Sequence, residues 1–115
     1  MLEDVISTWH AAVNGRDLEA AREAVTDPVD VSGPRGAGPI PAAAFVDWII
    51  GSGIRLRPLT WHPVADDTMV VEQEATWPDA TTPTRVATLF RVSDGKVGLV
   101  HRFSDLHEAL RAAQR

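Results

Sequence analysis

Two glutamates and one arginine are the residues whose types and positions best fit acid–base chemistry. Glu72 and Glu74 are two residues apart in the run Met69–Trp77, so in a strand they share one face. If that face is enclosed together with Arg102, the loss of water perturbs the protonation of both carboxylates. A competing interpretation starts from the odd-numbered residues of the run, which are more apolar and would face the core instead. A single bulge reverses the facing, so both interpretations stay open.

The histidines give no comparable pattern. His10, His62, His101 and His107 lack the close helical spacing of a zinc site, and the sequence contains no cysteine. We therefore expect no metal and no cofactor. The lack of cysteine also excludes a disulfide framework, an iron–sulfur cluster and a cysteine nucleophile.

Length and charge limit the organisation and the partners. The chain has 115 residues, and we expect residues 1–115 to form a single domain. A formal net charge of −5 argues against nucleic acid, because phosphate binding needs a clustered basic surface. The most apolar run, residues 40–50, is too short to span a bilayer, and the first residues are acidic where a secretory signal is basic. These features favour a cytoplasmic protein, and the preference for arginine over lysine suggests a bacterial genome.

Hydrophobic periodicity predicts helices in the first half of the chain. Apolar residues at three- and four-residue spacing predict a helix over residues 2–13, which ends at Asn14–Gly15 because both residues tolerate a left-handed conformation. Asp17 is expected to cap a second helix, and a third is expected to begin near Pro41, since proline is favoured in the first turn.

The second half of the chain changes to strand-like patterns. Strands are predicted over residues 29–31, 54–64, 69–77, 85–92 and 96–103. Residues 33–39 are rich in glycine and proline and predict a loop, while two prolines predict that the strand over 54–64 is an edge or bulged strand. A short last helix is capped by Asp105. The order α-α-β-α-β-β-β-β-α, with helices packed on an antiparallel sheet, makes the fold class α+β.

Three stretches carry a resemblance to a known family. They are Trp9–Leu18 at the junction of the first two helices, Val31–Pro34 before the glycine-rich segment, and Phe90–Val97 continued by His101–Asp105. These stretches resemble the SnoaL-like family of the nuclear-transport-factor-2-like superfamily, which is related to the steroid delta-isomerases and limonene epoxide hydrolases. The resemblance implies a cone, in which a curved sheet wraps around helices and a pocket opens at the wide end. It also implies a homodimer through the outer sheet face.

The resemblance assigns residues to the positions that carry chemistry in the related enzymes. The base of the isomerases corresponds to Gly33, and their two oxyanion donors correspond to Trp9 and Thr88. The two aspartates and the arginine of the epoxide hydrolases correspond to Thr88, Arg102 and Val86. Because glycine cannot transfer a proton, an indole and a hydroxyl remain as donors without a base. We therefore expect the chain to lack both known catalytic sets.

In the alignment with the SnoaL-like family, the even-numbered residues of the strands over 85–92 and 96–103 face the inside of the cone. The same parity would place Glu72 and Glu74 on that side as well. Helix stripes and this facing predict a ligand pocket lined by Trp9, Trp48, Thr88, Phe90, Val100 and Arg102.

Three functions stay open on these grounds. The first is a protein that binds a small, mostly apolar molecule, with Thr88 and Arg102 holding its polar end. The second is an enzyme of polyketide cyclase, isomerase or lyase type that uses Glu72 or Glu74 with Arg102. The third is a non-catalytic dimeric interaction module, in which side chains fill the cone.

Overall fold

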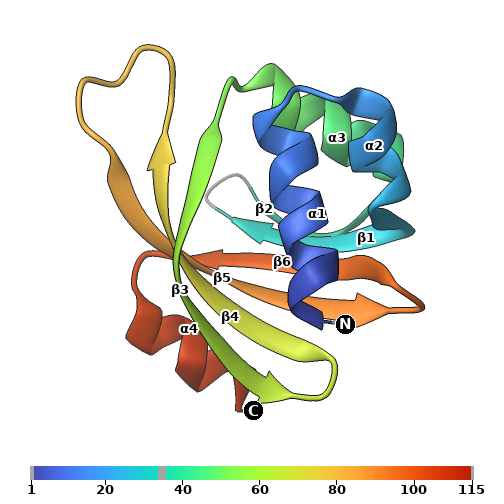
Figure 1. Cartoon of the computed structure of the whole chain (residues 1–115), viewed down its shortest axis with the longest axis vertical. Coiled ribbons are helices and arrows are strands. Elements are labelled where there is room, and N and C mark those ends of the chain that lie inside the picture. Colours follow the sequence, from blue (N-terminus) through green and yellow to red (C-terminus); the bar gives the residue numbers. More distant parts are fainter. Residues whose placement is uncertain (1, 34–35, 115) are drawn as a thin grey trace.

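A computed structural model describes residues 2–33 and 36–114 of the chain (Figure 1). The elements in chain order are α1 (Leu2–Asn14), α2 (Leu18–Glu23), β1 (Val25–Gly33), β2 (Gly36–Ile40), α3 (Ala42–Gly51), β3 (Arg55–Ala65), β4 (Thr68–Thr76), β5 (Thr84–Ser93), β6 (Lys96–Phe103) and α4 (Leu106–Ala113). Among the helices of the described residues, none is long and apolar enough to cross a membrane.

The strands form one six-stranded sheet in the order β2-β1-β6-β5-β4-β3. Neighbouring strands are antiparallel except β1 and β6, which run parallel, with Val31 opposite Val100. The predicted α+β class is confirmed, with a mixed sheet in place of the expected antiparallel one. The two parallel strands are far apart in the chain. After β2 come α3 and the strands β3, β4 and β5, and only then does β6 return to lie beside β1.

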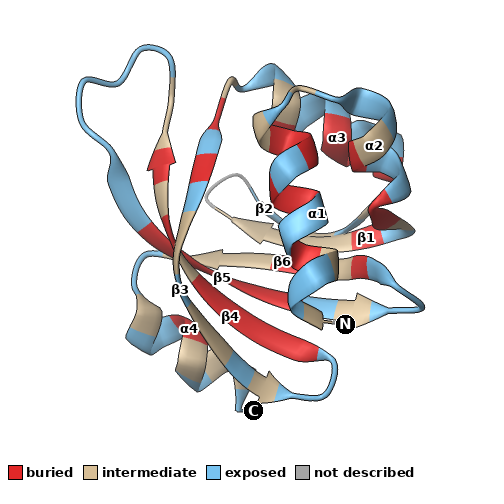
Figure 2. Ribbon diagram, in the orientation of Figure 1, coloured by how far each residue is buried: buried red, intermediate tan, exposed pale blue. Residues whose placement is uncertain are grey.

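The two faces of the sheet are covered by different helices, as Figures 1 and 2 show. We call the face under α1, α2 and α3 the inner face, and its core includes Ile6, Trp9 and Phe45. The opposite, outer face packs against α4 through a smaller cluster that includes Leu89 and Ala109. The homodimer contact expected through the outer face stays a prediction.

A strand, β2, occupies part of the segment for which a loop was predicted. Its residues pair antiparallel with β1, from Val29 opposite Ile40 to Gly33 opposite Gly36. Because β2 is an edge strand that pairs on one side only, Pro39 can lie in it without removing a ladder hydrogen bond. Gly36 has a φ of 136°, which side chains rarely adopt, so the glycine content permits this strand. Residues 34 and 35 of the predicted loop lie outside the described residues.

The strand β3 is both an edge strand and bulged, as its prolines predicted. Its register with β4 shifts between Pro58 and Thr60, so one extra residue interrupts the alternation. Before the bulge Leu56 is buried on the inner face, and after it Trp61 packs against the inner core. The bulge thus keeps an apolar residue on the inner face along both halves of the strand.

The junction between α1 and α2 is tied to the start of β3. The left-handed residue here is Arg16, with a φ of 58°, whereas Asn14–Gly15 was expected to supply it. The side-chain amide of Asn14 bonds the backbone of Leu56 as a neighbouring strand would. It donates to the Leu56 carbonyl and accepts from the Leu56 N–H, both at 2.8 Å. The Arg16 guanidinium donates to the carbonyls of residues 53 and 54, both at 2.7 Å. Side chains from α1 and its turn therefore hold the segment that follows α3.

Candidate functional site

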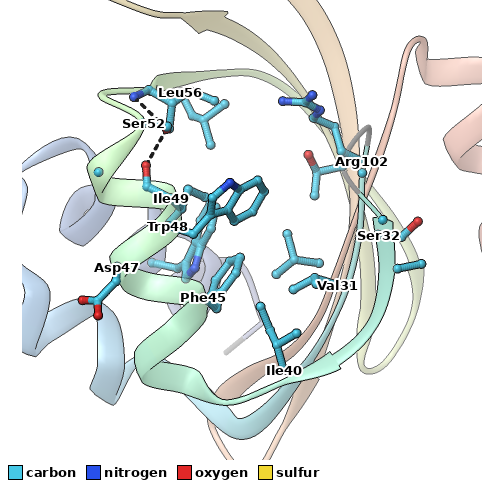
Figure 3. A pocket seen from close by; sticks show the side chains of 18 of the residues that line it. Val31, Ser32, Ile40, Phe45, Asp47, Trp48, Ile49, Ser52, Leu56 and Arg102 are labelled. Atoms are coloured by element: carbon cyan, nitrogen blue, oxygen red, sulfur yellow. Dashed lines mark hydrogen bonds between the residues drawn. The ribbon is translucent and has the colours of Figure 1, made fainter.

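A pocket of about 870 Å³ opens on the inner face (Figure 3). Its wall is formed by α3, by the β1–β2 hairpin and by the inward side chains of β3, β5 and β6. Aromatic and aliphatic side chains dominate this wall, among them Phe45, Trp48, Trp77, Ile40 and Val100. The volume and the apolar wall fit a small organic molecule.

The structure brings five of the six predicted pocket residues together around this pocket. They are Trp9, Trp48, Thr88, Val100 and Arg102. Trp48 is 42% exposed and forms part of the rim of the pocket, whereas Trp9 is 1% exposed and forms part of its floor. Phe90 was predicted to line the pocket but is completely buried below it, with its ring centroid 5.2 Å from that of Trp9.

Glu72 and Glu74 lie on the outer face of the sheet, so the interpretation that turned them toward the pocket is wrong. The competing interpretation, in which the odd-numbered apolar residues face the core, is confirmed. The Glu74 carboxylate accepts a hydrogen bond from the exposed guanidinium of Arg57 at 3.0 Å. The Glu72 carboxylate accepts one from the Thr60 hydroxyl at 3.2 Å. Both partners come from β3, and neither glutamate belongs to the residues that line the pocket.

The register between β4 and β5 explains this facing. Val71 lies opposite Thr88, and the two strands run antiparallel without a bulge from Thr68 to Ala75. Opposite residues in such a pair share a face, so the odd-numbered residues of β4 accompany the even-numbered residues of β5. This register brings Gln73 inward, where it is completely buried. The sequence signal for Gln73 was its place as the one polar residue in the odd-numbered apolar set of this strand.

Gln73 is the centre of a buried chain of hydrogen bonds, which we call the buried relay and which consists of Ile6, His10, Gln73 and Thr88. His10 Nδ1 lies 2.8 Å from the Ile6 carbonyl oxygen, and Gln73 Nε2 lies 2.7 Å from His10 Nε2. The Thr88 hydroxyl donates to Gln73 Oε1 at 2.7 Å. All three side chains are at most 3% exposed. The relay therefore leads from α1 through β4 to the wall of the pocket.

Burial keeps His10 neutral. The loss of water around the ring lowers the pKa of His10 from 6.5 to about 4, and the hydrogen bond to Ile6 offsets only part of this effect. In the neutral ring one nitrogen carries a proton and the other accepts a hydrogen bond. Sequence reasoning assigned His10 no role, because its partners are distant in the chain.

The pH dependence of stability follows from the lowered pKa of His10. Between pH 6.5 and about 4 the unfolded chain binds a proton at His10 that the folded chain does not bind. The contribution of His10 to the free energy of unfolding is thus expected to fall as the pH drops through this window, by about 3 kcal/mol in all. Urea denaturation at a series of pH values measures this loss. His10→Gln should remove the contribution, whereas the exposed control His107→Gln should keep it.

Arg102 is the cation among the described residues of the pocket wall. It lies opposite Thr88 in the β5–β6 register, and its guanidinium is 5.6 Å from the ring centroid of Trp77. Burial lowers the pKa of Arg102 from its usual value, because the cation has lost part of its water. Within residues 2–33 and 36–114, no carboxylate forms an ion pair with it. Asp47, on α3, is the one carboxylate among the described lining residues, and Figure 3 shows it pointing away from the pocket.

Solved structures with the same architecture are numerous. An NTF2-like protein of unknown function from Cytophaga hutchinsonii matches 96% of this chain and 95% of its own, with a TM-score of 0.81 and 11% identity. This chain has the nuclear-transport-factor-2-like fold. The predicted resemblance to that superfamily, with SnoaL-like relatives, is thereby confirmed at the level of the fold. No protein-family model and no curated protein matches the sequence.

Two further structures with the NTF2-like fold have stated roles. The match with a computationally designed 17-OHP binder spans 92% of this chain and 92% of the binder, with a TM-score of 0.77 and 15% identity. The epoxide hydrolase/cyclase-like enzyme SalBIII, with a role in pyran ring formation in the polyether salinomycin, covers 91% of each chain, with a TM-score of 0.74 and 15% identity. At these identities the likeness concerns the fold alone, so the function has to be argued from the pocket.

Proposed function

We propose that the inner-face pocket binds a small, mostly apolar molecule through an anionic end, such as a carboxylate. The observation that carries this proposal is Arg102, a half-buried cation in an aromatic and aliphatic wall with no ion-pair partner among the described residues. A cation that has lost water without gaining a counter-ion is unfavourable. A ligand carboxylate supplies that charge and can accept two parallel hydrogen bonds from the guanidinium.

The rest of the pocket suits the apolar body of such a ligand. Trp48 and Trp77 offer flat surfaces near the rim, and Val100 and Phe45 offer aliphatic and aromatic surface deeper in the wall. Aromatic side chains contribute large contact areas in ligand pockets. The designed 17-OHP binder, which shares the fold, supports the use of this architecture for holding a small organic molecule.

The other two functions considered from the sequence have less support. An enzyme that uses Glu72 or Glu74 with Arg102 needs these groups in one site, but both glutamates lie on the outer face, hydrogen-bonded to β3. An interaction module with a filled cone conflicts with a pocket of about 870 Å³.

The experiment that tests the proposal compares an acid with its neutral analogue. We expect 2-naphthoic acid to quench tryptophan fluorescence and to bind more tightly than 2-naphthamide, because Arg102 pairs with the carboxylate. Arg102→Gln is expected to weaken the binding of the acid by about 10- to 100-fold, since a hydrogen bond to a charged group is worth about 1.5–3 kcal/mol. The same change should leave the binding of the amide within about twofold.

Arg91→Gln is the matched control, since Arg91 is exposed on β5 and does not line the pocket. This variant should bind both compounds as the unchanged chain does. Equal binding of acid and amide by the unchanged chain, or an Arg102→Gln variant that keeps full affinity for the acid, would contradict the proposal.

A further inference from the structure

The direction of every hydrogen bond in the buried relay is fixed from one end. The Ile6 carbonyl oxygen can only accept, so His10 Nδ1 carries the proton of the neutral ring. His10 Nε2 must then accept, and the Gln73 amide nitrogen donates to it at 2.7 Å. This orients the Gln73 amide, whose oxygen accepts from the Thr88 hydroxyl at 2.7 Å. In the described residues no buried side-chain nitrogen or oxygen is left without a partner, as a fully consistent relay requires.

The relay determines what Thr88 can offer to a ligand. A threonine hydroxyl has one proton and two lone pairs, and here the proton is already donated to Gln73. Thr88 nevertheless belongs to the pocket wall, so its remaining capacity there is to accept a hydrogen bond. The resemblance to the isomerases implied the opposite role, a donor toward an oxyanion. The structure reverses that expectation, because the hydroxyl proton is used inside the protein.

We propose that Thr88 acts as a hydrogen-bond acceptor in the pocket, so that the preferred ligand is an apolar acid that also carries a hydroxyl or another donor group. The inference rests on the proposed function, which supplies the anionic end at Arg102. Thr88 and Arg102 lie opposite each other on neighbouring strands, so their side chains adjoin on the inner face. Arg102 can only donate, and the two residues therefore present a donor group next to an acceptor. The matching ligand is a hydroxy acid.

Matched ligands test this preference. The experiment compares 2-naphthoic acid with its 5-hydroxy and 6-hydroxy derivatives and with the corresponding methoxy acids, which can accept but cannot donate. At least one hydroxy acid is expected to bind about 3- to 10-fold more tightly than both the parent acid and its own methyl ether, as one net hydrogen bond implies. Thr88→Val should abolish this preference while the parent acid still binds, and Thr88→Ser should retain it.

The outcomes separate this inference from the proposed function. If the acids bind with no preference for a hydroxyl, or if a methoxy acid binds best, Thr88 is not the acceptor, although the role of Arg102 stands. If none of the acids binds, the proposed function fails and the inference fails with it.

A second measurement needs no ligand and no variant. Long-range nitrogen–proton correlation spectra of the histidine rings at neutral pH should show His10 with a protonated Nδ1 and an unprotonated Nε2. Observation of the opposite tautomer would overturn the inference, because the direction of the whole relay depends on that proton.

Discussion

Gln73→Leu is expected to lower the free energy of unfolding by about 2–4 kcal/mol, because it leaves two buried polar groups without a partner. Gln73 is completely buried and bonds both His10 and Thr88, which are each 3% exposed. Leucine has a similar size but no hydrogen-bonding group, so His10 Nε2 and the Thr88 hydroxyl lose their partners. Each such group costs about 1–3 kcal/mol. Urea denaturation followed by tryptophan fluorescence measures the change.

Two variants control this experiment. Glu72→Gln changes the neighbouring residue on the outer face and is expected to stay within about 0.5 kcal/mol of the unchanged chain. The double variant Gln73→Leu with Thr88→Val removes one of the two unpartnered groups. It should therefore be less destabilised than the sum of the two single variants. A Gln73→Leu variant as stable as the unchanged chain would show that the relay contributes nothing to stability.

The second large effect is expected for Gly53→Ala, in the turn between α3 and β3. Gly53 has a φ of 76°, and a Cβ added there would lie 2.5 Å from Pro78 Cγ and 2.8 Å from Pro78 Cδ. The left-handed conformation costs an alanine about 1–2 kcal/mol, and relief of the overlap costs about 1–3 kcal/mol more. We expect a loss of about 2–5 kcal/mol in the free energy of unfolding. Because Trp77 precedes Pro78 and lines the pocket, binding of 2-naphthoic acid should weaken as well.

Gly51→Ala is the matched control two residues earlier. Gly51 is the last residue of α3, and an added Cβ would meet no atom within 4 Å. Alanine has the higher helix propensity, so this variant is expected to be equally stable or more stable by up to about 1 kcal/mol. If both variants lose stability alike, the contact with Pro78 is not the cause.

Features that depend on neighbouring residues could be predicted from the sequence. Asp17 and Asp105 were expected to cap helices, and their carboxylates accept from the N–H groups of Ala20 at 3.1 Å and Glu108 at 2.8 Å. The prolines of β3 indicated an edge or bulged strand because proline removes a backbone donor. Each of these signals is local, and the structure confirms each of them.

Features that depend on distant pairing could not be predicted in this way. For Glu74, the alternation of residues 69–77 indicated the outer face and the family alignment indicated the pocket. The register of β4 against β5, which places Glu74 opposite Arg85, decides between the two. The β2 strand depends on pairing with β1, so its own glycines and Pro39 suggested a loop. The acceptor role of Thr88 depends on His10, which lies far away in the chain and is reached only through Gln73.

The two ends of the pocket differ in how firmly the backbone is held. Figure 3 places Leu56 at one end and Ile40 at the other. Leu56 exchanges two hydrogen bonds with the Asn14 side chain, and Arg16 donates to the carbonyls of the two residues just before it. Ile40 and Ala37 belong to β2, an edge strand paired on one side only. Attempts to redesign the pocket for longer or shorter ligands should therefore vary the side chains of β2. The end at Leu56 then stays in place, so the side chains chosen on β2 set the length of ligand that fits.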